Sequence, residues 1–407
     1  MDLSDSPEQA RYRETVRAWL AEHRDEAPAT SGSNEDGEYI AARRRWQGTL
    51  AEGGLAGVTW PAEYGGQGLG AVEHVIVNQE ISAAGVPGIL DTIGVGMLGP
   101  TIIGHGTDAQ KERYLDTMLR GEEIWCQLFS EPEAGSDLAN LATRAVRDGD
   151  EWVVNGQKVW NTLAHLAGKG MLVARTDPEL PKHKGLTYFM VDMHAPGVEV
   201  RPLRQITGEA EFNEVFFTDV RIPDAERLGD IGEGWHVSLT TLMNERVSIG
   251  GQIQPRGGGF IGEAVKIWKQ KGHTDPALKD ELMKLWVRAE VLRLTNIRAS
   301  QMRSVGTPGP EGSVSKILAA EHNKRVTSFI VDLLGADGML YTSYDMARPG
   351  ASMEWDCEQK AFLRMRANSI EGGTTEVMKN ILGERVLGLP GDARVDREVP
   401  WSQVPRN

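Results

Sequence analysis

Apolar residues recur at helical spacing through the first ~120 residues of the chain. One such set is Tyr12, Val16, Trp19 and Leu20. Residues 6–9 precede it with a serine N-cap, a first-turn proline and a capping-box glutamine, which together mark a helix start. Further helices are predicted over residues 39–50, 72–83 and 108–119. The glycine-punctuated segment 60–70 is predicted to be a loop.

From residue 125 to about residue 224 the pattern changes to short runs of β-branched and aromatic residues. Turn residues separate these runs, which predicts strands near residues 145–147, 152–154, 158–160, 172–175, 187–192, 198–202 and 214–220. The dipeptides Asp148-Gly149 and Asn155-Gly156 are typical of hairpin turns. We therefore predict an antiparallel β domain, as a barrel or a sandwich.

Helical periodicity returns after Pro223. Long helices are predicted from about residue 235, from residue 275, over residues 313–334 and from residue 374, and four such helices can form a bundle. The triplet Gly257–Gly259 is predicted to be a loop and not a phosphate cradle, because no strand precedes it. The fold class is thus α+β, with an all-α domain over residues 1–122, a β domain over 123–230 and a four-helix bundle over 231–407.

The composition narrows the function without identifying it. The chain has 407 residues, of which 40% are hydrophobic and 25% charged, which is ordinary for a globular protein. The net charge of −14 argues against nucleic-acid binding. Two cysteines give neither a disulfide framework nor a metal site. With no membrane-spanning apolar run and no signal-peptide pattern at the N-terminus, we expect a cytoplasmic enzyme.

Glu245 and Arg246 are the charged residues of the otherwise apolar helical stretch 237–250. A carboxylate in apolar surroundings is a candidate general base. The alternative is an ordinary salt bridge to a neighbouring helix. An idle buried carboxylate would be costly, however, which favours the catalytic interpretation.

Five motifs resemble those of the acyl-CoA dehydrogenase family. They are WPAEYGGQG (60–68), FSEPEAGSDLA (129–139), NGQKVWNT (155–162), FFTDVRIP (216–223) and GGTTEVMKNILGERVLGLP (372–390). The resemblance extends over nearly the whole chain. It implies a flavoprotein of fatty-acid or lipid metabolism, such as β-oxidation, that uses FAD to oxidise an acyl-CoA to the trans-2-enoyl-CoA. A carboxylate takes the α proton, flavin N5 receives the hydride, and an electron-transferring flavoprotein accepts the electrons.

The position of the base distinguishes groups within that family. Many members carry it as a glutamate in a Tyr-Glu-Gly-Thr run, where this chain has Gly372. Members similar to isovaleryl-CoA and long-chain-specific dehydrogenases hold it in a Glu-Arg pair on the first bundle helix, which Glu245 and Arg246 match. Glu371, one residue from the first position, is the competing candidate. Arg246 then either positions the substrate or neutralises a buried acid.

The resemblance also assigns ligand-binding residues. It places Gln127, Phe129 and Ser130 along the flavin ring, Gly135 and Ser136 at the phosphates and the substrate, Trp160 and Thr162 against the ring, and Thr374 and Glu376 at the adenosine half. The backbone N–H of Gly372 is expected to bind the thioester oxygen, which requires no side chain.

One segment departs from the family pattern. Family members usually have Arg-x-x-Phe-Gly near the start of the second bundle helix, reaching a neighbour's FAD, where this chain has Lys269-Gln270-Lys271-Gly272. Asp332 also stands where glutamine is usual. Either Lys269 or Lys271 substitutes, without the bidentate contact of arginine, or a different chain completes the site.

Several alternatives follow for assembly and activity. The assembly is a homotetramer or a heterotetramer, the latter as in bacterial relatives that act on steroid side chains. The other activities to consider are a subunit that only completes a partner's site and an oxidase that uses O₂. The base position is compatible with branched, long or bulky acyl chains and does not exclude short ones.

Overall fold

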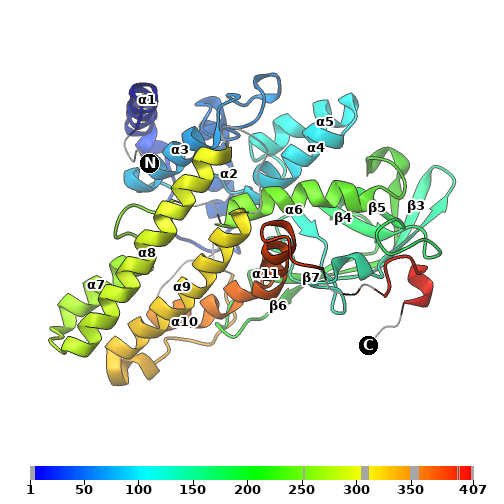
Figure 1. Ribbon diagram of the computed structural model, residues 1–407. Coiled ribbons are helices and arrows are strands. Elements are labelled where there is room, and N and C mark those ends of the chain that lie inside the picture. The colour runs from blue at the N-terminus through cyan, green and yellow to red at the C-terminus, as the bar shows by residue number, and fades with distance from the viewer. Residues whose placement is uncertain are drawn as a thin grey trace.

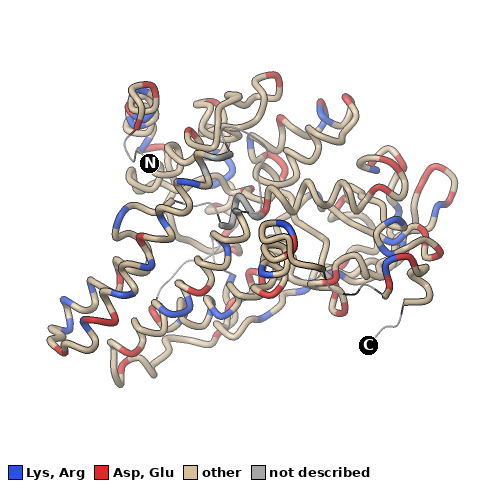
Figure 2. The backbone as a smooth tube through the Cα atoms, in the orientation of Figure 1, with Lys and Arg blue, Asp and Glu red and all other residues tan. Residues whose placement is uncertain are grey.

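The computed structural model describes residues 5–250, 253–303, 311–348, 357–391, 393 and 395–404. Figure 1 shows the N-terminal helices and the long C-terminal helices lying against one another, with the strands to one side of both. Acidic and basic residues alternate along the helices and are not gathered on one element (Figure 2). The predicted α+β class, with helical ends and a β middle region, is confirmed.

The N-terminal helices are α1 (Pro7–His23), α2 (Gly37–Glu52), α3 (Ala71–Ala84), α4 (Gly99–His105) and α5 (Asp108–Leu119). Four of them, α1, α2, α3 and α5, form where the apolar period predicts them, and the structure adds α4. The predicted capping box is present, since Ser6 Oγ accepts the N–H of Gln9 at 3.2 Å and Gln9 Oε1 accepts the N–H of Ser6 at 2.9 Å. Val16, Leu20, Trp46 and Leu50 bury their side chains together between these helices.

A buried carboxylate precedes the π-helical turn η3 (Gly94–Leu98), which leads into α4. Asp91 is fully buried, its Oδ1 accepts the N–H of Gly94 at 2.8 Å, and its own N–H donates to Gln47 Oε1 at 2.9 Å. Burial raises the pKa of Asp91 to about 7. Between about pH 4 and pH 7 the folded protein therefore keeps a proton on Asp91 that the unfolded chain releases.

We expect this carboxyl to reduce stability as the pH rises from about 4 to about 7, with a slope of at most about 1.4 kcal/mol per pH unit. The sign follows from the raised pKa of the folded state. Below the unfolded pKa the carboxyl is protonated in both states and costs no stability, and this advantage is lost as the pH rises to the folded pKa. Asp91→Asn should remove this slope, as measured by urea unfolding across that range. Equal slopes in both proteins would contradict the prediction.

Within the described residues, eight strands form one sheet in the order β6-β7-β3-β2-β4-β5-β8, with β1 paired to β4. The strands are β1 (Trp125–Leu128), β2 (Arg144–Asp148), β3 (Glu151–Lys158), β4 (Lys169–Arg175), β5 (Leu186–Asp192), β6 (Val198–Leu203), β7 (Phe212–Pro223) and β8 (Arg227–Leu228). Most pairs are antiparallel, as predicted, but β1 and β2 each run parallel to β4. The connection from β1 to β4 is long enough for parallel pairing because it includes β2 and β3.

The prediction of a hairpin turn at Asn155-Gly156 is wrong. Both residues lie inside β3, where the pairing with β7 shifts between Val154 and Gly156, as in a β-bulge. A Cβ on Gly156 would lie 2.4 Å from Thr143 Oγ1, so glycine permits close packing here instead of forming a turn. The other predicted turn, at Asp148-Gly149, is confirmed between β2 and β3.

The C-terminal helices are α6 (Gly234–Gly250), α7 (Phe260–Lys271), α8 (Pro276–Arg303), α9 (Glu311–Leu334), α10 (Glu358–Arg364) and α11 (Thr375–Arg385). The four predicted long helices are α6, α8, α9 and α11, and the structure adds α7 and α10. Ile261, Leu285 and Phe329 belong to one core between α7, α8 and α9. Lys269 and Lys271 lie in the last turn of α7, not early in a longer helix. Across the described ranges, no helix has the length and apolar character needed to cross a membrane.

Candidate functional site

Glu245 lies near the C-terminal end of α6, and its side chain is half-buried. Buried hydroxyls fix this helix on the rest of the molecule, because Thr241 Oγ1 lies 2.9 Å from Thr101 Oγ1 and 3.2 Å from Tyr188 Oη. The Gln127 side chain, on β1, donates from Nε2 to Glu245 Oε2 at 3.3 Å. The neutral amide orients the carboxylate without adding a charge.

A network of amide groups joins Gln127 to the turn that follows β3. Asn161 Nδ2 donates to the carbonyl of Gln127 at 2.7 Å. Asn161 and Asn213 exchange backbone hydrogen bonds of 3.0 and 3.1 Å, and Asn213 Nδ2 also donates to the Asn161 carbonyl at 3.0 Å. Arg348 completes the set by donating to Asn213 Oδ1 at 3.0 Å. The turn is therefore held by a network in which Asn161 and Asn213 are buried and Gln127 and Arg348 are half-buried.

Trp160 occupies this turn in a strained conformation. Its φ is +62°, which is unfavourable for a residue with a bulky side chain. The indole is 57% exposed and meets the Phe212 ring edge-to-face at 5.6 Å. Thr162 is half-buried two residues later. A rigid turn that presents a large exposed ring, and that is linked through Asn161 and Gln127 to a half-buried carboxylate, has the character of a ligand-binding wall.

A buried ion pair holds the segment that carries Phe129, Ser130 and the residues after them. Lys158 Nζ lies 2.8 Å from Glu131 Oε1 and donates to the Phe129 carbonyl at 3.0 Å. The Glu131 carboxylate also accepts the N–H groups of residues 142 and 143. Burial alone would raise the pKa of Glu131, but the Lys158 charge and these hydrogen bonds outweigh it and hold the pKa below its usual value.

The predicted flavin-lining residues of this segment differ in exposure. The Phe129 ring is buried edge-to-face against Tyr188 at 5.7 Å. The Ser130 carbonyl accepts the N–H of Val159 at 2.9 Å, next to Trp160. Gly135 and Ser136 are exposed.

The loop before α11 has left-handed φ values of +61° at Gly372 and +89° at Gly373, which glycine adopts without strain. Lys316, a buried lysine on α9, donates to the Gly373 carbonyl. Thr374 caps α11, because its Oγ1 accepts the N–H of Val377 at 3.1 Å, and Glu376 is exposed in the first turn.

Glu371, the competing base, is held in an ion pair. Arg364 lies 3.0 Å from its Oε2, and Asn368 Nδ2 donates to its Oε1 at 2.6 Å. Arg364 also pairs with Glu211 at 2.8 Å, and the Glu211 carbonyl accepts the N–H of Leu163 at 3.4 Å. Arg364 therefore links the Gly372 loop to the turn that carries Trp160 and Thr162.

The structure thus joins Glu245, Gln127 and the Trp160 turn by direct hydrogen bonds, and it connects the Gly372 loop to them through Arg364 and Glu211. The side chain of Arg246 lies outside the described residues. Lys269 is exposed, while Lys271 Nζ pairs with Asp337 Oδ2 at 2.7 Å. This ion pair places the end of α7, which carries Lys269, beside the turn that follows α9, a few residues after Asp332.

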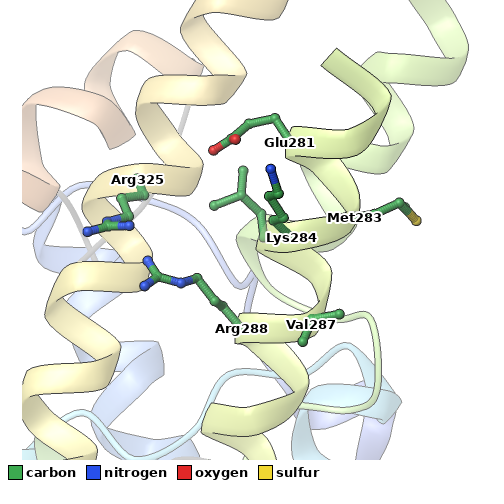
Figure 3. A pocket seen from close by; sticks show the side chains of 7 residues that line it. Glu281, Met283, Lys284, Val287, Arg288 and Arg325 are labelled. Atoms are coloured by element: carbon green, nitrogen blue, oxygen red, sulfur yellow. The ribbon is translucent and has the colours of Figure 1, made fainter. Parts of the chain in front are cut away.

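A hollow of about 550 Å³ on the bundle surface lies away from these groups. It is lined mainly by α8, with Arg325 of α9, and Figure 3 shows the side chains of Arg288 and Arg325 extending toward each other. No residue of the predicted site lines it.

Several residues that build the site were not predicted. They are Glu131, Lys158, Asn213, Lys316 and Arg364, all buried or nearly so. Little in the sequence pointed to them, because Lys158 and Lys316 lie in elements that contain several other polar residues. Their burial, which requires a polar partner, is visible only in the folded molecule.

Comparison with known proteins identifies three consecutive family domains. Residues 6–122 match the acyl-CoA dehydrogenase N-terminal domain, residues 126–220 its middle domain, and residues 232–387 its C-terminal domain. The chain is 39% identical to acyl-CoA dehydrogenase IpdE1 of Mycobacterium tuberculosis over 390 residues, which cover 94% of this chain and 98% of the relative.

Two solved structures resemble the chain over nearly its whole length. The first, the Tcur3481-Tcur3483 steroid ACAD, has a TM-score of 0.78 and 28% identity, covering 96% of this chain and all of that one. The second, the ChsE4-ChsE5 complex from Mycobacterium tuberculosis, has a TM-score of 0.76 with the same identity and coverage.

Proposed function

The chain belongs to the acyl-CoA dehydrogenase family, and on that premise we propose that it converts an acyl-CoA thioester to the trans-2-enoyl-CoA with Glu245 as the base. Enzymes of this family act on acyl-CoA and use FAD. The observation that carries the proposal is the half-buried Glu245 carboxylate, oriented by Gln127 and connected through Asn161 to the turn of Trp160.

The residues around this turn fit a flavin. The exposed Trp160 indole offers a flat apolar wall, Gln127 offers an amide, and the strained turn is fixed by Asn213 before any ligand binds. Gln127, Trp160 and Thr162 would hold the ring, and Thr374 and Glu376 the adenosine half. Bound there, FAD would accept the hydride that leaves the β carbon.

The chain's own residues would supply the proton chemistry. Glu245 would take the α proton, whose acidity is too low unless negative charge on the thioester oxygen is stabilised. The backbone N–H groups of the Gly372 loop would donate to that oxygen. Lys316, at the Gly373 carbonyl, and Arg364, through Glu371, would keep the loop in place. Because these supports lie outside the reacting atoms, they are positioning residues.

Replacing Trp160 by alanine is expected to weaken FAD binding by roughly tenfold, because stacking on an aromatic face contributes about 1–1.5 kcal/mol. The exposed indole contributes little to folding, so thermal stability should change little. The measurement is FAD titration of the apoprotein, followed by the flavin fluorescence. Val146→Ala, at an exposed position on β2, serves as the control. Unchanged affinity for FAD in Trp160→Ala would show that the Trp160 ring does not stack on the flavin.

We infer further that the acyl group is bulky and that an electron-transferring flavoprotein takes the electrons. The first inference is supported by the likeness to a steroid-acting relative and by the base on α6. The test is anaerobic bleaching of the purified flavoprotein by straight short, branched, long and steroid-side-chain CoA thioesters. Bleaching by the bulky thioesters supports the proposal, and no bleaching by any of them overturns the dehydrogenase function.

A second proposal concerns assembly, in which a related chain completes the FAD site. It is supported by the resemblance to a complex of two differently named chains, and by Lys271, whose charge is already paired with Asp337. The visible spectrum of the chain purified alone tests it. Colourless protein that gains flavin on co-expression with a related chain supports it. Near one flavin per chain without a partner would indicate a homo-oligomer that uses Lys269.

A further inference from the structure

The turn that follows β3 is strained at two residues. Leu163 has a φ of +56°, in addition to the +62° of Trp160, so two of the three non-glycine residues with left-handed backbone in the described part of the chain lie in this turn. Both side chains are bulky, and such a conformation persists only where surrounding contacts hold it. The residues that grip the turn therefore decide where the Trp160 ring lies.

Asn213, the second residue of β7, is fully buried and grips this turn. Its Oδ1 accepts a hydrogen bond from Arg348 at 3.0 Å, and its Nδ2 donates to the Asn161 carbonyl at 3.0 Å. A guanidinium can only donate and a carbonyl can only accept, so these partners determine which end of the amide is oxygen and which is nitrogen. Any further group bonded to Asn213 Nδ2 must therefore be an acceptor.

His165, which lies in the same stretch of chain, provides that acceptor. Its Nδ1 lies 3.2 Å from Asn213 Nδ2, so Nδ1 carries no proton and the proton of the neutral ring is on Nε2. Nε2 is buried and has no hydrogen-bond partner among the described residues, which leaves the bond to Asn213 to orient the imidazole. Burial, and then the charge of Arg348, lower the pKa of His165 to about 4, in keeping with a neutral ring near neutral pH.

A continuous series of hydrogen bonds runs from this ring to the base. Asn161 Nδ2 donates to the Gln127 carbonyl at 2.7 Å, and Gln127 Nε2 donates to Glu245 Oε2 at 3.3 Å. We propose that neutral His165 is a positioning residue for the reaction, because its Nδ1 holds the Asn213 amide that keeps the strained turn and Gln127 in place. This role rests on the proposed function. Since His165 acts through Asn213, its loss should slow the chemical step and leave the affinity for the acyl-CoA nearly unchanged.

Two variants separate the acceptor from the bulk of the ring. Phenylalanine keeps a ring but has no acceptor, while asparagine is smaller and carries an oxygen near the position of Nδ1. His165→Phe is expected to lower the saturating rate of flavin bleaching by about tenfold, as for one lost hydrogen bond, with KM nearly unchanged. His165→Asn should recover most of that rate. If phenylalanine preserved the rate and asparagine lost it, ring packing would be what matters and the proposal would be wrong.

A double variant tests whether His165 acts through Gln127. In the Gln127→Ala background, His165→Phe should cause little further loss of the bleaching rate, because the series of hydrogen bonds is already broken. A further tenfold loss would overturn the proposed route to the base. His23→Phe is the control, since His23 Nδ1 lies 2.9 Å from the Trp19 carbonyl within α1, and the bleaching rate should not change.

The protonation of the ring can be measured without substrate. In protein labelled at the histidine ring nitrogens, the nitrogen NMR signals absent from His165→Asn should show a neutral ring with its proton on Nε2 near neutral pH. A proton on Nδ1, or a charged ring, would overturn the proposal whatever the activity. Failure of the wild type to react with any acyl-CoA, with the proton found on Nε2, would instead refute the proposed function and with it this role.

Discussion

Glu245→Gln is expected to give folded protein that binds FAD and whose turnover is lower by at least about 10³-fold, within the range for loss of a general base. Glutamine keeps the shape of the side chain and can still meet Gln127 Nε2, which donates to Glu245 Oε2 at 3.3 Å. It cannot take a proton, so the α C–H would remain intact. The measurement is the rate of anaerobic flavin bleaching by an acyl-CoA in a stopped-flow spectrometer.

Glu371→Gln is the matched control, since it removes the competing carboxylate. Arg364 and Asn368 already bind that carboxylate. The variant should therefore loosen the Gly372 loop and lower turnover by no more than about tenfold, as expected for a lost positioning contact. If Glu371→Gln abolished bleaching while Glu245→Gln retained it, the role of base would pass to Glu371.

Much of the fold could be predicted because its signals are local. The Ser6 capping box and the apolar period identify α1 directly, and helix α5 begins and ends at the predicted residues. The hairpin turn predicted at Asn155-Gly156 was wrong because the same dipeptide can form a turn or a β-bulge. Only the distant Thr143, packed against Gly156, distinguishes the two uses. Prediction from sequence is weakest where the deciding contact is far along the chain.

The candidate site likewise has residues that the sequence could predict and contacts that it could not. Glu245 could be proposed from its apolar neighbours and from a motif, and Trp160 from a motif alone. The left-handed backbone of Trp160 could not, because it depends on Asn213, which lies more than 50 residues later in the sequence. The pairing of Arg364 with Glu211 and Glu371 is likewise a property of the folded molecule.

Lys158→Met is expected to lower the free energy of unfolding by about 3–5 kcal/mol, because it leaves Glu131 buried without its cation. Lys158 is fully buried, and Nζ lies 2.8 Å from Glu131 Oε1. Lys169→Met is the matched control. Lys169 pairs with the half-exposed Asp192 at 3.3 Å, so that loss should stay within about 1 kcal/mol. Urea unfolding of the two variants and the wild type measures both effects.

The cost in Lys158→Met should come from the charge and not from the lost methylene packing. Adding Glu131→Gln to that variant should therefore recover part of the loss, since it removes the buried charge and the amide oxygen can still accept the N–H of residue 142 or of residue 143, which bind different oxygens of the carboxylate. A double variant as unstable as Lys158→Met would show that packing dominates.

The pH dependence tests the same point independently. Because Lys158 and the backbone donors hold the pKa of Glu131 low, its stabilising contribution is full above the unfolded pKa of about 4.3 and is lost as the pH falls through the folded value. Without Lys158 the carboxyl can fold protonated in acid at little electrostatic cost. The stability difference between wild type and Lys158→Met should therefore be largest near neutral pH and shrink below about pH 4. A stability difference that stays constant with pH would mean that the charge on Glu131 does not cause it and that the lost packing of Lys158 does.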